Sequence, residues 1–172
     1  NGNITTLNQT VVIDDTIAPT VPVLSNVTGQ CSVTVPRPTA IDNCNNTVIF
    51  GTTSSPLTYN SEGTYNITWT FNDGHGNTST ANQTVIVNDT IAPVVPTLTT
   101  LSSQCSITAI APTTTDNCSG IITGTTSNPI TYSSQGTYVI TWNFNDGHGN
   151  NSTANQTVVI NSNIASSAPV IN

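Results

Sequence analysis

The sequence predicts an all-β protein built from tandem immunoglobulin-like β-sandwich repeats of about 74 residues. Three observations predict this class. Long blocks of sequence recur at an offset of 73 to 74 positions. Apolar and polar residues alternate along several segments, as they do on strands with one buried face. Short runs of β-branched residues are bounded by Pro, Gly, Asn and Asp. About seven short strands per repeat around a central Trp favour a sandwich over a barrel.

The repetition also predicts the domain organisation. Residues 6–24 match residues 80–98 at 13 of 19 positions, and residues 62–84 match residues 135–157 at 19 of 23. The chain therefore reads as a fragment of a longer tandem array. The expected segments are residues 1–16 as the last strand of a preceding repeat, 17–89 and 90–161 as two repeats, and 162–172 as a linker to, or the start of, a following unit.

One strand pattern in each repeat is especially clear. Tyr65, Ile67, Trp69 and Phe71 alternate with polar residues, and the second repeat carries the same pattern around Trp142. This phase directs both Trp side chains into the core, which we favour over a sugar-stacking role at the surface. No window shows helical periodicity.

Composition excludes several functional classes. Lys plus Arg total one residue against eight acids, for a net charge of -7, so neither a nucleic-acid surface nor an anionic-membrane patch is expected. No apolar run is long enough to span a bilayer. Without Lys the chain has no Schiff-base chemistry. Glu62 and Asp73 could form an acid–base pair, but Glu62 becomes Gln135 in the second copy, so we expect no enzyme.

Four cysteines form two equally spaced pairs, Cys31 with Cys44 and Cys105 with Cys118. Three connectivities are possible, and closure within each repeat is the most economical. Such a loop would contribute about 3 kcal/mol in the chain-entropy model and would imply an oxidising, extracellular location. A zinc site is the weaker alternative, because structural zinc sites use four ligands at short spacings.

Three motifs carry a family resemblance: Pro38 to Cys44, Gly63 to Asn77 and Asp89 to Pro93, each with its copy in the other repeat. Together they resemble the HYR-type immunoglobulin-like repeats of Bacteroidota cell-surface proteins, including gliding-motility adhesins. The resemblance covers nearly the whole chain. It implies exported, non-catalytic stalk or adhesive modules at the cell surface.

The seven Asp residues all lie in turn or linker motifs, where the linker and two loops of a sandwich meet at one end. Converging carboxylates without nearby Lys or Arg favour a bound hard cation, so Ca²⁺ at the junctions between repeats is one hypothesis. The competing interpretation is turn chemistry, since Asp side chains bond the backbone two residues on. The candidate ligands are Asp14, Asp15, Asp42, Asp73, Asp89, Asp116 and Asp146.

Two further features concern the linker and the loops. Thr16 and Thr90 lie in Asp-Thr-Ile, which resembles the O-glycosylation motif of Bacteroidota surface proteins, and an unmodified extended linker is the equal alternative. His75 and His148 occupy equivalent loop positions and are expected to be exposed loop residues instead of ligands.

Two functional classes remain. The favoured one is a structural stalk or filament segment of a large extracellular adhesin, whose partners are neighbouring repeats of the same chain. The alternative makes the repeats themselves bind surface glycans or other cells, and a phage fibre or decoration protein would share the fold. A stalk predicts equivalent faces in both repeats, whereas a binding module predicts one face that differs sharply from its copy.

Overall fold

The computed structural model describes residues 1–44 and 46–161. It divides into two compact units, Asn1–Val87 and Asn88–Asn172. Every regular element in the described residues is a β-strand, which confirms the all-β prediction, and the packed sheets agree with an immunoglobulin-like sandwich. None of these residues forms a helix long and apolar enough to cross a membrane.

Unit 1 contains two very long strands and several short ones. The alternating segment around Trp69 forms β6, as the period-two pattern predicts. Residues 82–87 lie in β7. The strands of this unit are β1 (Val27–Gly29), β2 (Val33–Thr34), β3 (Thr39–Ile41), β4 (Val48–Phe50), β5 (Thr58–Tyr59), β6 (Gly63–Asn72) and β7 (Thr78–Val87).

Unit 2 repeats this order. Its long strands are the copies of β6 and β7, and its short strands again precede them. The strands are β8 (Leu101–Ser103), β9 (Ile107–Thr108), β10 (Thr113–Asp116), β11 (Gly120–Thr123), β12 (Thr131–Tyr132), β13 (Gly136–Asn145) and β14 (Asn151–Ile160).

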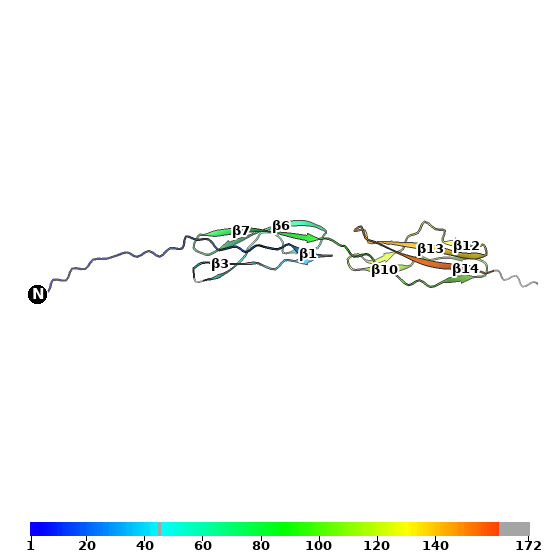
Figure 1. The fold of residues 1–172 in the computed structure, drawn as a ribbon, viewed down its shortest axis with the longest axis horizontal. Coiled ribbons are helices and arrows are strands. Elements are labelled where there is room, and N and C mark those ends of the chain that lie inside the picture. The colour runs from blue at the N-terminus through cyan, green and yellow to red at the C-terminus, as the bar shows by residue number, and fades with distance from the viewer. Residues whose placement is uncertain (45, 162–172) are drawn as a thin grey trace, which may run out of the picture. The chain divides into compact units, whose positions relative to one another are not determined.

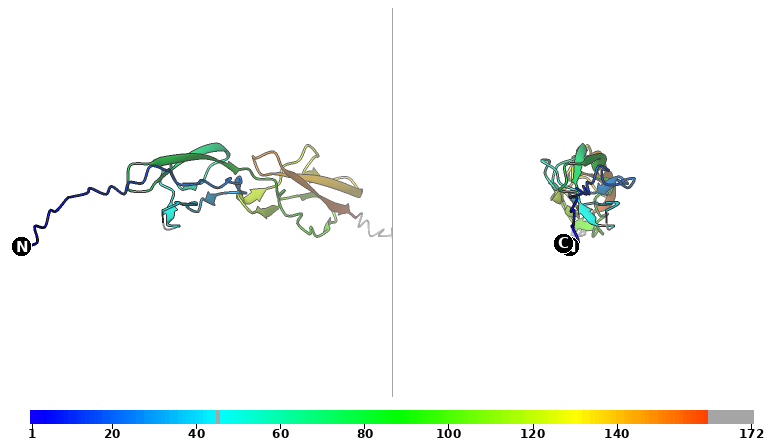
Figure 2. Two further views of the ribbon diagram at one scale, coloured as in Figure 1. Left: turned by 60° about the vertical axis from the view of Figure 1, so that its left-hand side comes forward. Right: turned by 90° about the vertical axis from the view of Figure 1, so that its left-hand side faces the viewer.

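The long hairpin organises each unit. β6 and β7 pair antiparallel over ten residues, from Gly63 opposite Val87 to Asn72 opposite Thr78. β1 adds to β7 in parallel, with Gly29 opposite Val87. The short β3–β4 and β2–β5 pairs form the other layer, and Figures 1 and 2 show β3 on the side of unit 1 away from the hairpin. In unit 2, β13, β14 and β8 form the corresponding sheet.

The hairpin gives each unit two distinct ends. We call the end with the β6–β7 turn the entry end, because the linker around Asp15 lies there. The opposite end, where β7 stops at Val87, is the exit end. The entry end of unit 2 likewise carries the β13–β14 turn and the linker around Asp89.

The core lies between the two layers and is built from the alternating residues of the hairpin. Trp69 is 0% exposed, as are its neighbours Ile67 and Phe71 on the same face of β6. The indole Nε1 of Trp69 donates to Gln83 Oε1 at 2.9 Å, and Gln83 Nε2 donates to the backbone oxygen of Ser25 at 3.0 Å. The prediction that both Trp side chains are core residues is confirmed, since Trp142 is equally buried.

The residues before Thr20 form no strand in this structure (Figure 2). Val11 and Ile13 are 75% and 95% exposed, although the repeat alignment places them at the positions of Val85 and Val87, which are buried in β7. The assignment of residues 1–16 to the last strand of a preceding repeat stays a prediction. The expected segment 162–172 lies outside the described residues.

Candidate metal centre

Three carboxylates meet at the entry end of unit 1. Asp15 comes from the linker, Asp42 from the turn after β3, and Asp73 from the β6–β7 turn. Ligand atoms of Asp15, Asp42 and Cys44 lie within 4.8 Å of one another, and so do those of Asp15, Asp73 and His75. The structure therefore brings together the linker and loop carboxylates that the sequence predicted to converge.

The β6–β7 turn is shaped by Asp73 and two glycines. Asp73 Oδ1 accepts from the backbone N–H of His75 at 2.7 Å and of Asn77 at 3.1 Å. Gly74 and Gly76 have φ values of 82° and 106°, a region that side chains other than glycine rarely adopt. The Asp-Gly-His-Gly-Asn sequence therefore folds back tightly and presents the Asp73 carboxylate towards the linker.

Side-chain hydrogen bonds hold the linker against this turn. Asn77 Nδ2 donates to the backbone oxygen of Asp15 at 3.0 Å and to Asp73 Oδ2 at 2.7 Å. Ser79 Oγ donates to the backbone oxygen of Pro19 at 2.8 Å, and Thr20 then pairs with Ile41 in β3. The linker is thus part of the folded unit, and Asp15 has a fixed position.

Asp15 and Asp42 each use one carboxylate oxygen for a turn. Asp15 Oδ1 accepts from the backbone N–H of Ile17 at 3.1 Å, and Asp42 Oδ2 accepts from that of Cys44 at 3.0 Å. The remaining oxygen of Asp42, Oδ1, is buried and accepts no hydrogen bond, whereas the Asp15 carboxylate also interacts with the Cys44 thiol. Asp42 is only 3% exposed. Turn chemistry accounts for one oxygen of Asp42 and leaves the other unexplained.

Unit 2 repeats the arrangement at its own entry end. Ligand atoms of Asp89, Asp116 and Cys118 lie within 4.8 Å of one another. Asp116 Oδ1 accepts from the backbone N–H of Cys118 at 2.8 Å and of Ser119 at 2.9 Å, whereas its Oδ2 is buried and accepts none. Asp89 is 3% exposed, and its Oδ1 accepts from the backbone N–H of Ile91 at 3.1 Å.

Two predicted ligands stand apart from these clusters. Asp14 is exposed and belongs to none of the groups found among the described residues. Asp146 is buried, but its oxygens serve the β13–β14 turn: Oδ1 accepts from the backbone N–H of His148 at 2.8 Å, and Oδ2 from Asn150 Nδ2 at 2.7 Å. Asp146 is connected to the linker through Asn150, whose Nδ2 also lies 3.2 Å from the backbone oxygen of Asp89.

Three members of the clusters were not predicted from the sequence. His75, assigned to an exposed loop, is exposed but lies within reach of Asp15 and Asp73. Cys44 and Cys118 also lie beside the carboxylates, because each follows its Asp by two residues and is held by that Asp through its backbone N–H. The Asp-Asn-Cys spacing was the signal that could have revealed this.

The electrostatics of the site follow from its charges and hydrogen bonds. The pKa of the Cys44 thiol is raised, first by its interaction with the Asp15 carboxylate, then by burial and by the negative charges of Asp15, Asp42 and Asp73. For Asp73, burial acts to raise the pKa, but hydrogen bonds from Asn77 and His75 outweigh it and the pKa is lowered. Asp146 shows the same balance with Asn150 and His148. The entry end is therefore strongly negative around Cys44.

The structure corrects the predicted disulfides. Cys31 and Cys118 are disulfide-bonded, whereas Cys44 and Cys105 are free thiols, so the pairs Cys31–Cys44 and Cys105–Cys118 are wrong for this structure. The reason is the length of the hairpin. Cys31 follows β1 at the exit end, and Cys44 lies beside Asp42 at the entry end.

A ten-residue strand separates these two ends by roughly 30 Å. Bridged cysteines have Cα atoms within about 7 Å. Unit 2 places its cysteines in the same way, with Cys105 after β8 at the exit end and Cys118 beside Asp116 at the entry end. The two cysteines of each unit therefore lie too far apart to bridge each other.

The two candidate glycosylation residues lie on the surface. Thr16 and Thr90 are exposed, each one residue after the linker Asp that accepts a backbone hydrogen bond. Exposure makes both accessible to modification, which stays a prediction.

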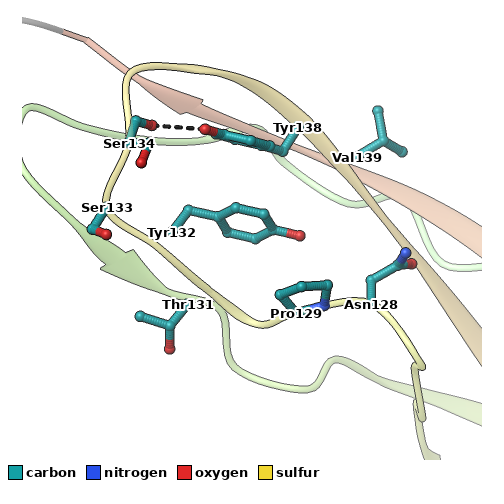
Figure 3. Close-up of a pocket in the computed structure, with 8 residues that line it drawn as sticks. All are labelled: Asn128, Pro129, Thr131, Tyr132, Ser133, Ser134, Tyr138 and Val139. Carbon is teal, nitrogen blue, oxygen red and sulfur yellow. Dashed lines mark hydrogen bonds between the residues drawn. The ribbon is translucent and has the colours of Figure 1, made fainter.

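An open pocket of about 470 Å³ lies on unit 2. Figure 3 shows Tyr132 and Tyr138 side by side in it, with the Tyr138 hydroxyl donating to the backbone oxygen of Ser134 at 2.9 Å. The two rings stack with centroids 4.5 Å apart. Tyr59 and Tyr65 form the same pair in unit 1, also at 4.5 Å, so the aromatic feature is common to both units. Both pairs pack against their cores.

Comparison with known proteins connects the chain to one domain type. Residues 17–87 match the HYR-like domain with 4 cysteines, and this segment holds two cysteines, Cys31 and Cys44. The chain is 34% identical over 171 residues to hyalin of Strongylocentrotus purpuratus, covering 88% of this chain and 14% of the hyalin. It is 31% identical over 175 residues to hyalin of Lytechinus variegatus, covering 90% of this chain and 33% of that protein. The chain thus spans a third or less of these relatives.

Proposed function

We propose that this chain is a non-catalytic structural segment of a larger extracellular repeat protein, which extends a distal binding region from the cell surface. The observation that carries the proposal is the equivalence of the two units. The Trp–Gln hydrogen bond, the tyrosine pair and the pair of linker and turn carboxylates recur in both. A spacer predicts equivalent modules, whereas recognition of one ligand predicts a face on one unit that differs from its copy on the other.

Several features support an extracellular place for this segment. Two cysteines are disulfide-bonded, and disulfides persist in oxidising compartments. The HYR-like match of residues 17–87 agrees with the resemblance drawn from the motifs. An origin in a Bacteroidota gliding-motility adhesin is a narrower proposal, which rests on the motifs alone.

A second candidate function is direct binding by the units. The observation that favours it is the pocket on unit 2, where two tyrosines and several hydroxyl and amide groups resemble the make-up of glycan-binding surfaces. The residue of unit 1 that is equivalent to Val139 in this pocket is Asn66, which is a modest difference between the two copies. The stacked ring faces also leave less aromatic surface open for a sugar.

A replacement experiment in the longer protein separates the two candidates. Both units are exchanged for two unrelated immunoglobulin-like domains of similar length, and cell attachment is measured alongside surface display. A spacer predicts attachment close to that of the original protein. Loss of attachment at unchanged display would assign binding to these units and overturn the structural role.

A further inference from the structure

We propose that each unit binds one Ca²⁺ ion at its entry end, between the linker carboxylate and the carboxylate of the following turn. In unit 1 these are Asp15 and Asp42, and in unit 2 they are Asp89 and Asp116. This inference concerns cation binding by the folded unit and stands whether the units are spacers or binding modules.

The first step of the argument is the buried oxygen that turn formation leaves over. Asp42 is 3% exposed and Asp116 is 9% exposed, and each has one oxygen that accepts no hydrogen bond. A buried carboxylate oxygen without a partner is costly unless a charge compensates it. Arg37 is the one Lys or Arg residue in the sequence, and it is exposed. His75 lies near Asp15 and Asp73 but is not a member of the group that contains Asp42.

The second step is convergence. The unpaired oxygens belong to carboxylates whose ligand atoms lie within 4.8 Å of a second Asp from the linker, and the linker is held there by Asn77 or its copy Asn150. Two carboxylates at this distance repel each other, and a cation bound between them removes the repulsion. Asp73 and its turn lie next to the pair in unit 1 and add further negative charge.

The third step selects the ion. What recurs in both units is a pair of carboxylates, and carboxylate oxygens are ligands that suit Ca²⁺. Zinc would draw on Cys44 and His75 in unit 1. The equivalent Cys118 is disulfide-bonded and offers no thiolate, so a zinc site would not recur.

The Asp-to-Asn exchange distinguishes a cation site from a turn cap. Asn retains the oxygen that accepts the backbone N–H, so Asp42→Asn and Asp116→Asn keep the turns but lose the charge. Asp14→Asn is the matched control, since Asp14 is exposed and lies outside the clusters. The 172-residue chain is stripped of metal and titrated with CaCl₂ by calorimetry, and its melting temperature is followed in the same buffers.

The original chain and Asp14→Asn are expected to bind two ions, with dissociation constants between about 0.1 and 1 mM, and to melt higher with Ca²⁺. Each single variant should bind one ion, and the double variant should bind none and show no shift. Absence of binding at about 10 mM Ca²⁺ would overturn the proposal. So would two ions in the double variant, or a zinc site that disappears in Cys44→Ser with no calcium response.

Discussion

Asn77 joins the linker to the turn at the entry end of unit 1, because its Nδ2 lies 3.0 Å from the backbone oxygen of Asp15. The same amide group donates to Asp73 Oδ2 at 2.7 Å, and Asn150 repeats both contacts in unit 2. One side chain thus connects residues 62 positions apart in sequence. The folded position of the linker depends on it.

Replacing Asn77 should therefore destabilise unit 1. Asn77→Ala removes a hydrogen bond to a carboxylate and one to a linker carbonyl, and we expect the free energy of unfolding to fall by about 1–2 kcal/mol. Urea unfolding followed by tryptophan fluorescence measures the change. Asn60→Ala, at an exposed loop position, is the control and should stay within about 0.5 kcal/mol. Equal stability of the two variants would contradict the role of Asn77.

The buried Trp69–Gln83 hydrogen bond predicts a second effect. Gln83→Leu leaves the Trp69 N–H without its acceptor in the core, and the loss should be about 1–3 kcal/mol. Thermal unfolding of the variant measures it, with Gln135→Leu as a control at an exposed position. A Gln83→Leu protein as stable as the original would show that this bond contributes nothing net.

The lowered pKa of Asp146 predicts a pH dependence. Burial acts to raise this pKa, but the hydrogen bonds from Asn150 and His148 outweigh it, so the folded protein binds the proton more weakly than the unfolded chain. The stabilisation is present above the ordinary carboxyl pKa of about 4 and is lost as the pH falls through the lower folded pKa.

Urea unfolding of the original chain and of Asp146→Asn, compared from neutral pH to about pH 2.5, tests this dependence. The original should be more stable at neutral pH, and the difference should shrink below about pH 4. A difference that is constant across this range would contradict the assignment.

The positions of the cysteines predict the result of peptide mapping. Free thiols are alkylated before proteolysis, and the chain is cleaved at low pH without reduction so that disulfides do not exchange. Alkylation is expected at Cys44 and Cys105, and the peptides of Cys31 and Cys118 should carry a disulfide. A Cys31–Cys44 or Cys105–Cys118 peptide would contradict the separation of the two ends.

The alternation of apolar and polar residues predicted the long strands and their buried faces. The alternation around Trp69 and Trp142 marks β6 and β13, and it gives the buried face correctly. The parallel pairing of β1 with β7 brings together residues 58 positions apart, such as Val27 and Val85, and a three-residue strand carries no local signal for that partner. The tandem repetition did show that the same pairing would occur twice.

The candidate site was predicted in outline. Topology placed Asp15, Asp42 and Asp73 at one end, and the structure brings them together. The separation of Asp14 from Asp15 follows from extended backbone, where successive side chains point to opposite sides. The predicted disulfide pairing was wrong for a different reason. A short loop between two cysteines favours a disulfide, but the long hairpin holds Cys31 and Cys44 at opposite ends of the unit.

The structural role is tested most directly by the binding behaviour of the chain itself. The folded, oxidised 172-residue protein is labelled and titrated onto intact cells and immobilised glycans, with Tyr132→Ala as the variant of the unit 2 pocket. A structural segment should show no saturable binding, either as the original chain or as the variant. Saturable binding that unlabelled protein displaces, and that Tyr132→Ala abolishes while the variant remains folded, would contradict it and make the units recognition modules.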